Sequence, residues 1–236
     1  RQIRSQTDTI ISGSMAPQFF NRVTWPNTDL DLYVTRASAA LAAFFLVENG
    51  YTFDPRKSQV KSVSVQLCAS TREKPPSYLG RGIADVLDFH KGDKKIQLIV
   101  ATTSPMEIIL SFHSTAVMNI ITHDTAYSLY PWSTFVTKQA LVVETVGAGQ
   151  EAGGRKYAGR GWKMIRSPFP SCNSELGVRI ARSVGDHFTW IISLPPISHL
   201  PLLHETTNLA SAYAWELDCD GKTTHTTLHQ LESPPP

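Results

Sequence analysis

In the first half of the chain, hydrophobic and polar positions alternate in short runs that predict strands separated by helices. Residues 9–12 form a β-type run, and residues 14–20 a short helical stretch. Residues 29–35, DLDLYVT, alternate with the period of a strand. Residues 38–49 are helical in pattern and end before Gly50, the residue type that most often follows a helix C-terminus.

A hairpin and a capped helix complete this half. Residues 83–89 and 95–101 flank the turn-forming residues 91–94 and predict a β-hairpin. Residues 104–107, Ser-Pro-Met-Glu, form a capping box with proline at the first helical position, and we expect the helix to run to Ile121. Strands that alternate with helices favour an α/β or α+β sheet flanked by helices.

The second half carries weaker patterns. We predict a helix over residues 133–144, a flexible loop over 147–154, and a second hairpin from residues 178–183 and 187–194. Residues 231–236 end in three prolines and predict a mobile tail. The expected organisation is a core over residues 1–145 and a less regular, loop-rich extension over 146–236 that contains a β-hairpin, packs on the core and ends in the mobile tail.

Composition and charge narrow the class of protein. The 236 residues are 42% hydrophobic and 18% charged, which excludes general disorder. The net charge of +2 is too balanced to predict nucleic-acid or membrane binding by itself. The longest apolar run, residues 37–47, is too short to span a bilayer, and the polar start does not resemble a signal peptide. We therefore expect an intracellular protein, cytoplasmic or nuclear, without a membrane partner; because it begins with Arg1, it is compatible with a segment of a longer chain.

Two short motifs carry the candidate chemistry. Residues two apart in a strand face the same side, so Asp29 and Asp31 present two carboxylates together. Such a pair repels unless a cation separates it, and Mg²⁺ prefers oxygen ligands. Upstream, Gly13 and Ser14 end a strand at a predicted helix start, where free backbone N–H groups favour an anion. A phosphate cradle beside an acidic metal site is the minimum apparatus for phosphoryl or nucleotidyl transfer.

These motifs resemble the signature of the nucleotidyltransferase superfamily, the polymerase-beta-like fold. The resemblance rests on ISGSMA, DLDLYV, KIQLIV and SPMEIILSFHSTAVMN, spans about residues 7–145, and extends to a group of uncharacterised fungal members of this fold. It implies a mixed sheet flanked by helices, in which Gly13 and Ser14 hold nucleotide phosphates and Asp29 and Asp31 bind Mg²⁺. The third carboxylate of the family falls on the strand 95–100, where this chain has Gln97.

The resemblance implies Mg²⁺-dependent transfer from a nucleoside triphosphate to a hydroxyl of a protein side chain, a nucleic-acid end or a small molecule. The alternatives are a catalytically degenerate member that binds nucleotide or a protein partner without turnover, and a plain interaction module. We expect Asp29, Asp31 and Gln97 on neighbouring strands with side chains on one face. Asp85 and Asp88, on the preceding strand, are predicted to face solvent, although one of them could replace the missing acid.

One basic and aromatic segment follows the core. Its members are Arg155, Lys156, Tyr157, Arg160, Trp162, Lys163 and Arg166. If it folds toward the aspartate pair, Lys156 and Arg160 would contact phosphates while the rings stack a base; the alternative is a solvated loop that Trp162 anchors to the core. Residues 147–152 also match the G-x-G-x-x-A dinucleotide fingerprint. We reject that match because residues 153–161 predict no helix to receive a pyrophosphate.

Overall fold

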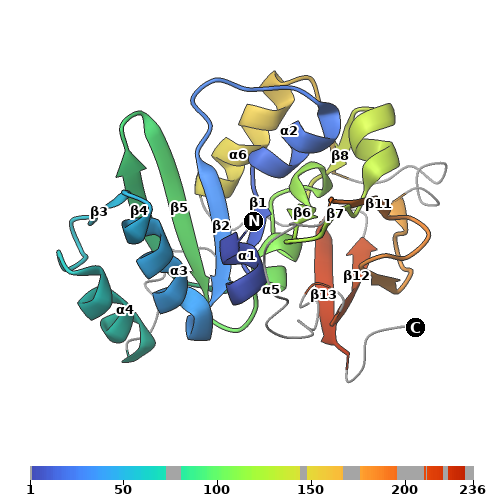
Figure 1. Cartoon of the computed structure of the whole chain (residues 1–236). Helices are drawn as coiled ribbons and strands as arrows, with labels where there is room; N and C mark the ends of the chain where they lie inside the picture. Colours follow the sequence, from blue (N-terminus) through green and yellow to red (C-terminus); the bar gives the residue numbers. More distant parts are fainter. Residues whose placement is uncertain are drawn as a thin grey trace.

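The chain folds as a mixed α+β structure around one large sheet with helices on its faces (Figure 1), as seen in a computed structural model. The structure describes residues 2–72, 81–143, 148–166, 176–195, 210, 212–219 and 223–231. Within these ranges, no helix is both long enough and apolar enough to cross a lipid bilayer.

The large sheet has eight strands in the order β11-β7-β6-β1-β2-β5-β4-β3. Only β2 and β5 are paired in parallel, and the other neighbours are antiparallel. The predicted strands at the centre of this sheet and the hairpin β4–β5 are confirmed. The strand bounds are Ile10–Ser12 (β1), Leu30–Thr35 (β2), Thr52–Asp54 (β3), Ile83–Lys91 (β4), Lys94–Ala101 (β5), Asn119–Ile121 (β6), Thr125–Ser128 (β7) and Trp190–Ser193 (β11).

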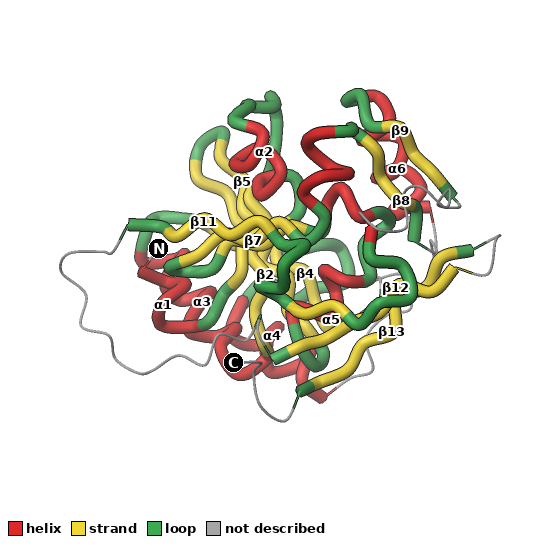
Figure 2. Tube along the Cα trace, turned by 90° about the vertical axis from the view of Figure 1, so that its right-hand side faces the viewer, coloured by secondary structure: helices red, strands yellow, loops and turns green. Residues whose placement is uncertain are grey.

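Three helices cover one face of the sheet: α1 (Gln2–Thr7), α3 (Arg36–Glu48) and α4 (Val63–Arg72). In the view of Figure 2 they lie to one side of the strands, and β12 and β13 lie to the other. The predicted helix α3 is confirmed, with the Thr35 side chain capping its start and Gly50 at φ +79° just after its end. Ala39, Ala42 and Ala43 of α3 are buried against the sheet, and together with leucines and Phe89 they belong to one core cluster.

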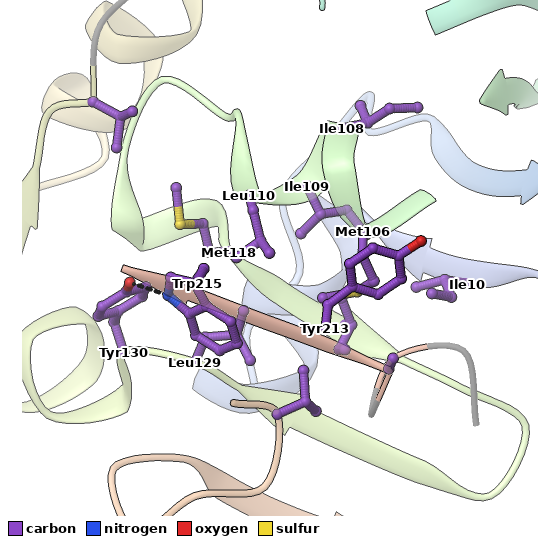
Figure 3. Close-up of a cluster of buried hydrophobic side chains, with 14 of the residues drawn as sticks. Ile10, Met106, Ile108, Ile109, Leu110, Met118, Leu129, Tyr130, Tyr213 and Trp215 are labelled. Atoms are coloured by element: carbon purple, nitrogen blue, oxygen red, sulfur yellow. Dashed lines mark hydrogen bonds between the residues drawn. The ribbon is translucent and has the colours of Figure 1, made fainter. Parts of the chain in front are cut away.

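The opposite face is covered by α5 (Pro105–Leu110) and by a small sheet of β10 (Arg182–Ser183), β12 (Tyr213–Cys219) and β13 (Thr224–Gln230). The core between them is drawn in Figure 3, where Trp215 donates a hydrogen bond to the Tyr130 hydroxyl at 2.7 Å. This cluster takes residues from both sides of position 145, such as Ile10 and Trp215.

The remaining elements gather above the strand ends near Gly13. Helix α2 (Met15–Asn21) follows β1 as predicted, and α6 (Ala148–Gly159) contacts the turn before it, where Lys156 lies 3.1 Å from Ser14. A short parallel pair, β8 (Gln139–Leu141) and β9 (Lys163–Ile165), a 3₁₀ turn (Thr115–Val117) and a π-helical turn (Trp132–Val136) complete the described chain.

Several expectations for individual elements are wrong. The helix that begins at the Ser104 cap ends at Leu110, because the chain turns at Ser111 and continues into strand β6. In place of the helix expected over residues 133–144, the described residues to 143 contain a π-helical turn and strand β8. The two arms of the expected second hairpin join different sheets, since β10 pairs with β12 and β11 pairs with β7.

The flexible loop expected over residues 147–154 is also wrong for residues 148–154, which belong to α6; residue 147 lies outside the described residues. The C-terminal β-hairpin is β12–β13 instead. The proline-rich end, residues 232–236, lies outside the described residues.

Candidate active site

The site lies where β2 and β5 begin, on the sheet face that carries Tyr33. The strand register places Asp31 opposite Gln97, and Gln97 opposite Asp88 on β4. Residues that are opposite one another in a sheet share a face, and Asp29, two residues before Asp31, belongs to that face as well. The expected placement of Asp29, Asp31 and Gln97 on one face is therefore confirmed.

Gly13 lets the first turn of the site approach the aspartates. Its φ of +62° is a left-handed conformation that favours glycine, and a Cβ built on it would overlap the Asp31 carboxylate. Strand β1 pairs with β2 so that Ser12 lies opposite Asp31. The Gly13–Ser14 turn is thus folded directly over that carboxylate.

Substitution of Gly13 by alanine is expected to lower the free energy of unfolding by about 1–3 kcal/mol, because it adds a left-handed alanine and displaces Asp31. Thermal or urea unfolding measures this loss. Gly92→Ala is the matched control, since Gly92 also has a positive φ, of +56°, but nothing lies within 4 Å of its Cβ position. Equal losses in the two variants would contradict the close approach of Gly13 to Asp31.

The two aspartates differ in their electrostatic surroundings. Burial and the neighbouring Asp29 charge raise the pKa of Asp31 to about 7, although Lys156, the Ser14 backbone N–H and Lys95 act in the opposite direction. The Asp29 side chain is 38% exposed and lies 3.3 Å from the Lys95 ammonium. The unbalanced negative charge of the site is therefore concentrated at Asp31.

Helix α6 brings basic side chains to this charge. The Lys156 ammonium donates a hydrogen bond to the Ser14 hydroxyl at 3.1 Å, and burial lowers the pKa of Lys156. Arg160, one turn further along, stacks its guanidinium on the Trp25 ring at 3.7 Å from the ring centre. The structure thus brings Lys156 to Gly13, Ser14 and the aspartate pair, and it places Arg160, in the turn just after α6, beside Trp25.

The aromatic residues of the same segment do not line an open surface. Tyr157 and Trp162 are both 3% exposed and pack with Trp25, and the Trp162 ring N–H donates to the Thr134 carbonyl oxygen. Base stacking by these two rings is therefore wrong as an expectation, and the anchoring role of Trp162 is confirmed. The segment is not a loop: residues 155–159 belong to α6 and residues 163–165 to β9. Gly153 lets α6 pack on the His113 ring, whose Cδ2 would lie 2.6 Å from an added Cβ.

The position of the expected third carboxylate is occupied by a hydrogen-bonded pair. The Gln97 amide donates to the Asp88 carboxylate at 2.6 Å, and the same carboxylate accepts from Arg56 at 3.0 Å and lies 3.6 Å from Lys95. Burial raises the pKa of Asp88, but its hydrogen bonds and cationic neighbours lower it more. The prediction that Asp88 faces solvent is wrong, because its side chain is only 13% exposed.

Asp85 is buried as well, so the same expectation fails for it. It is 6% exposed and accepts hydrogen bonds from the Gln59 and Gln66 side chains. Asp85 lies opposite Val100, whereas Asp88 lies opposite Gln97. Asp85 is therefore a structural hydrogen-bond acceptor, and Asp88 is the acid of β4 that lies beside the site.

Asp29 and Asp31 fit a hard divalent cation. Both offer carboxylate oxygens. Burial and the Asp29 charge raise the pKa of Asp31 more than Lys156, Lys95 and the Ser14 backbone N–H lower it, so a bound cation would favour its ionised form. Among the described residues, no group of three or more His, Cys, Asp and Glu side chains could hold a metal ion without other ligands. A bound ion would need oxygens from a substrate, as is usual for Mg²⁺.

Sequence reasoning missed Lys95, which contacts both Asp29 and Asp88. Its spacing of two residues from Gln97 on a predicted strand placed it on the same face, and that signal could have identified it.

Searches of family models, curated proteins and solved structures found no match to this chain. The expectation that no helix follows the dinucleotide fingerprint is wrong, because α6 begins at Ala148. However, Gly149 lies inside this helix rather than in a turn before it. The fingerprint needs its glycines in that turn, so the rejection stands for a different reason.

Proposed function

We propose that this site binds a nucleoside triphosphate with Mg²⁺ and transfers the nucleotidyl group to an acceptor hydroxyl. The observation that carries the proposal is the close packing of the Gly13–Ser14 turn, the Asp29–Asp31 pair and Lys156 at one point of the sheet. A hydroxyl and an ammonium stand there beside two carboxylates. This combination suits a polyphosphate and a metal ion together.

Each of these residues has a distinct part in the proposal. Asp29 and Asp31 would hold Mg²⁺, which when bound neutralises phosphate charge and aligns the reacting groups. The Ser14 hydroxyl and the Lys156 ammonium would hold phosphate oxygens, and the Lys156–Ser14 hydrogen bond already orients both. Arg160 would extend the cationic surface along α6. The acceptor would be a protein side chain, a nucleic-acid end or a small molecule.

A second candidate function is nucleotide binding without turnover. It is favoured by Gln97, which stands in the place of a carboxylate, and by Asp88, whose oxygens are held by Arg56 and Gln97. Asp88 is therefore poorly placed to take the proton of an acceptor hydroxyl.

Two measurements separate these functions. Calorimetry with each nucleoside triphosphate, with and without Mg²⁺, tests binding, and release of pyrophosphate or transfer of labelled nucleotide to the protein itself, RNA or small hydroxyl compounds tests turnover. Binding that requires Mg²⁺, followed by transfer, supports the first function. Mg²⁺-dependent binding without transfer supports the second, and no binding contradicts both.

Replacement of Lys156 by glutamine is expected to weaken nucleotide binding by about tenfold or more, because a charge-assisted hydrogen bond to phosphate is lost. The dissociation constant with Mg²⁺ present measures this effect. Arg155→Gln is the matched control, since Arg155 precedes Lys156 on α6, is exposed, and forms an ion pair with the exposed Glu151. A similar loss in both variants would indicate a general charge effect rather than a contact from Lys156.

A further inference from the structure

Lys95 stands among the acidic side chains of the site. Its ammonium lies 3.3 Å from an Asp29 oxygen and 3.6 Å from an Asp88 oxygen, and its side chain is only 31% exposed. Lys95 directly precedes Ile96, the register partner of Leu30, so the backbone of two paired strands holds it across from Asp29. The contact is thus built into the start of the sheet.

The two ends of this arrangement are balanced differently. At one end Asp88 is neutralised by Arg56 and Lys95 and hydrogen-bonded by Gln97. At the other end Asp31 has no ion pair within 4.0 Å among the described residues. Asp29 lies between these two carboxylates and forms an ion pair with Lys95. The charge of Asp88 is therefore already compensated by basic side chains, whereas the carboxylate of Asp31 is the one that a bound cation would neutralise.

Enzymes that transfer phosphoryl or nucleotidyl groups often use two metal ions about 3.5–4 Å apart. Here a lysine and a neutral glutamine stand where further ligands to a second ion would be needed. We infer that Lys95 is a built-in cation that replaces one of these ions, so that the site accepts a single divalent ion, which must compete with Lys95 for Asp29. This inference rests on the proposed function, because it concerns the metal occupancy of the same site.

The test uses Mn²⁺ as the probe, with its free concentration followed by electron paramagnetic resonance. Lys95→Met keeps the aliphatic stem of the side chain and removes the charge. We expect it to bind Mn²⁺ in the absence of nucleotide at least about tenfold more tightly than the unmodified chain, because the competing ammonium is gone. Lys94→Met is the matched control: it removes the same charge from the adjacent, exposed position of β5 and should change the affinity by less than about twofold.

With saturating α,β-methylene-ATP, an ATP analogue, the complex of the unmodified chain should hold one Mn²⁺ in total, shared between the aspartates and the analogue, and the complex of Lys95→Met should hold two. Lys95→Met combined with Asp31→Asn should lose the gained affinity. Two ions on the unmodified chain, or an unchanged Mn²⁺ affinity in Lys95→Met, would overturn the inference. Thermal melts establish that each variant is folded, and Lys95→Gln replaces Lys95→Met if the latter is not.

The outcomes also separate this inference from the proposed function. If nucleotide analogues fail to bind while Lys95→Met gains Mn²⁺ affinity, the proposed function is wrong and the role of Lys95 stands. If the unmodified chain binds the analogue with two ions, the proposed function stands and the role of Lys95 is wrong.

Discussion

Replacement of Asp186 by alanine is expected to lower the free energy of unfolding by about 3–5 kcal/mol, the largest stability loss that we predict for this chain. The reason is its partner, Arg182, which is 1% exposed and stacks its guanidinium near the rings of Tyr130, Phe188 and Trp215. Among the described residues, Asp186 is the one carboxylate paired with this arginine. Without it, a buried cation would keep only its hydrogen bond to the Leu129 carbonyl oxygen at 2.8 Å.

Urea unfolding of Asp186→Ala at pH 7 measures this loss. Asp218→Ala is the matched control, because its pairing with Arg179 lies at the surface with side chains 61% and 68% exposed. We expect it to cost no more than about 1 kcal/mol. Combining Arg182→Met with Asp186→Ala should recover part of the stability, since no buried charge then remains. A loss for Asp186→Ala as small as that of Asp218→Ala would contradict this account of the core.

The same pair predicts a pH dependence. Burial raises the pKa of Asp186, but the hydrogen bonds and charge of Arg182, with Thr189 and the Ser183 backbone, lower it below its usual range. A depressed pKa contributes stability above the unfolded value near 3.8 and loses it as the pH falls through the folded value. The difference between the unmodified chain and Asp186→Ala should therefore shrink below about pH 4.

The centre of the large sheet could be predicted from the sequence because its strands follow local rules. The alternation in residues 29–35, the turn at Gly92 and the position of Gly50 after α3 each depend on neighbouring residues alone. The pairing of β2 with β5, which brings Asp31 beside Gln97, was reached through the motif rather than through the pattern. Local signals and one recognised motif thus sufficed for the aspartate pair and its turn.

The rest of the structure depends on contacts between distant segments. Helix α6 contains Gly149, Gly153, Gly154 and Gly159, and its composition predicts a loop; tertiary packing of Gly153 on His113 and of Tyr157 on Trp25 outweighs that propensity. The burial of Asp88 could not be predicted for the same reason, because its partners Arg56 and Lys95 are 32 and 7 positions away in the sequence. Alternation predicts which face a side chain occupies, but not whether that face is covered.

Replacement of Asp31 by asparagine is expected to weaken Mg²⁺-dependent nucleotide binding by about 100-fold or more, because a metal ligand loses its charge. The free protein should not be weakened in the same way. Asparagine keeps an oxygen that can accept from the Ser14 N–H, and it ends the repulsion with Asp29 that contributes to the high pKa of Asp31. We expect the variant without ligand to gain about 1 kcal/mol of stability at neutral pH.

The sign of that gain follows from linkage. The pKa of Asp31 is raised to about 7 from 3.8, so the folded chain binds this proton more tightly than the unfolded chain does. The ionised carboxylate therefore costs stability progressively from about pH 4 upward, and the cost is complete above about pH 7. Asp31→Asn removes the cost, so its advantage over the unmodified chain should be greatest above pH 7 and absent below pH 4.

Thermal melts of both proteins, each with and without Mg²⁺ and nucleotide, measure the two effects in one experiment. Asp93→Asn, in the exposed turn between β4 and β5, is the matched control and should change neither the apo stability nor the ligand-induced shift. If Asp31 instead has a structural role, Asp31→Asn should lose about 1–3 kcal/mol through its charged hydrogen bonds. A loss of apo stability, or an unchanged ligand-induced shift in the variant, would count against the metal site, because a pair of carboxylates that repel one another at a cost to the fold is typical of a functional site.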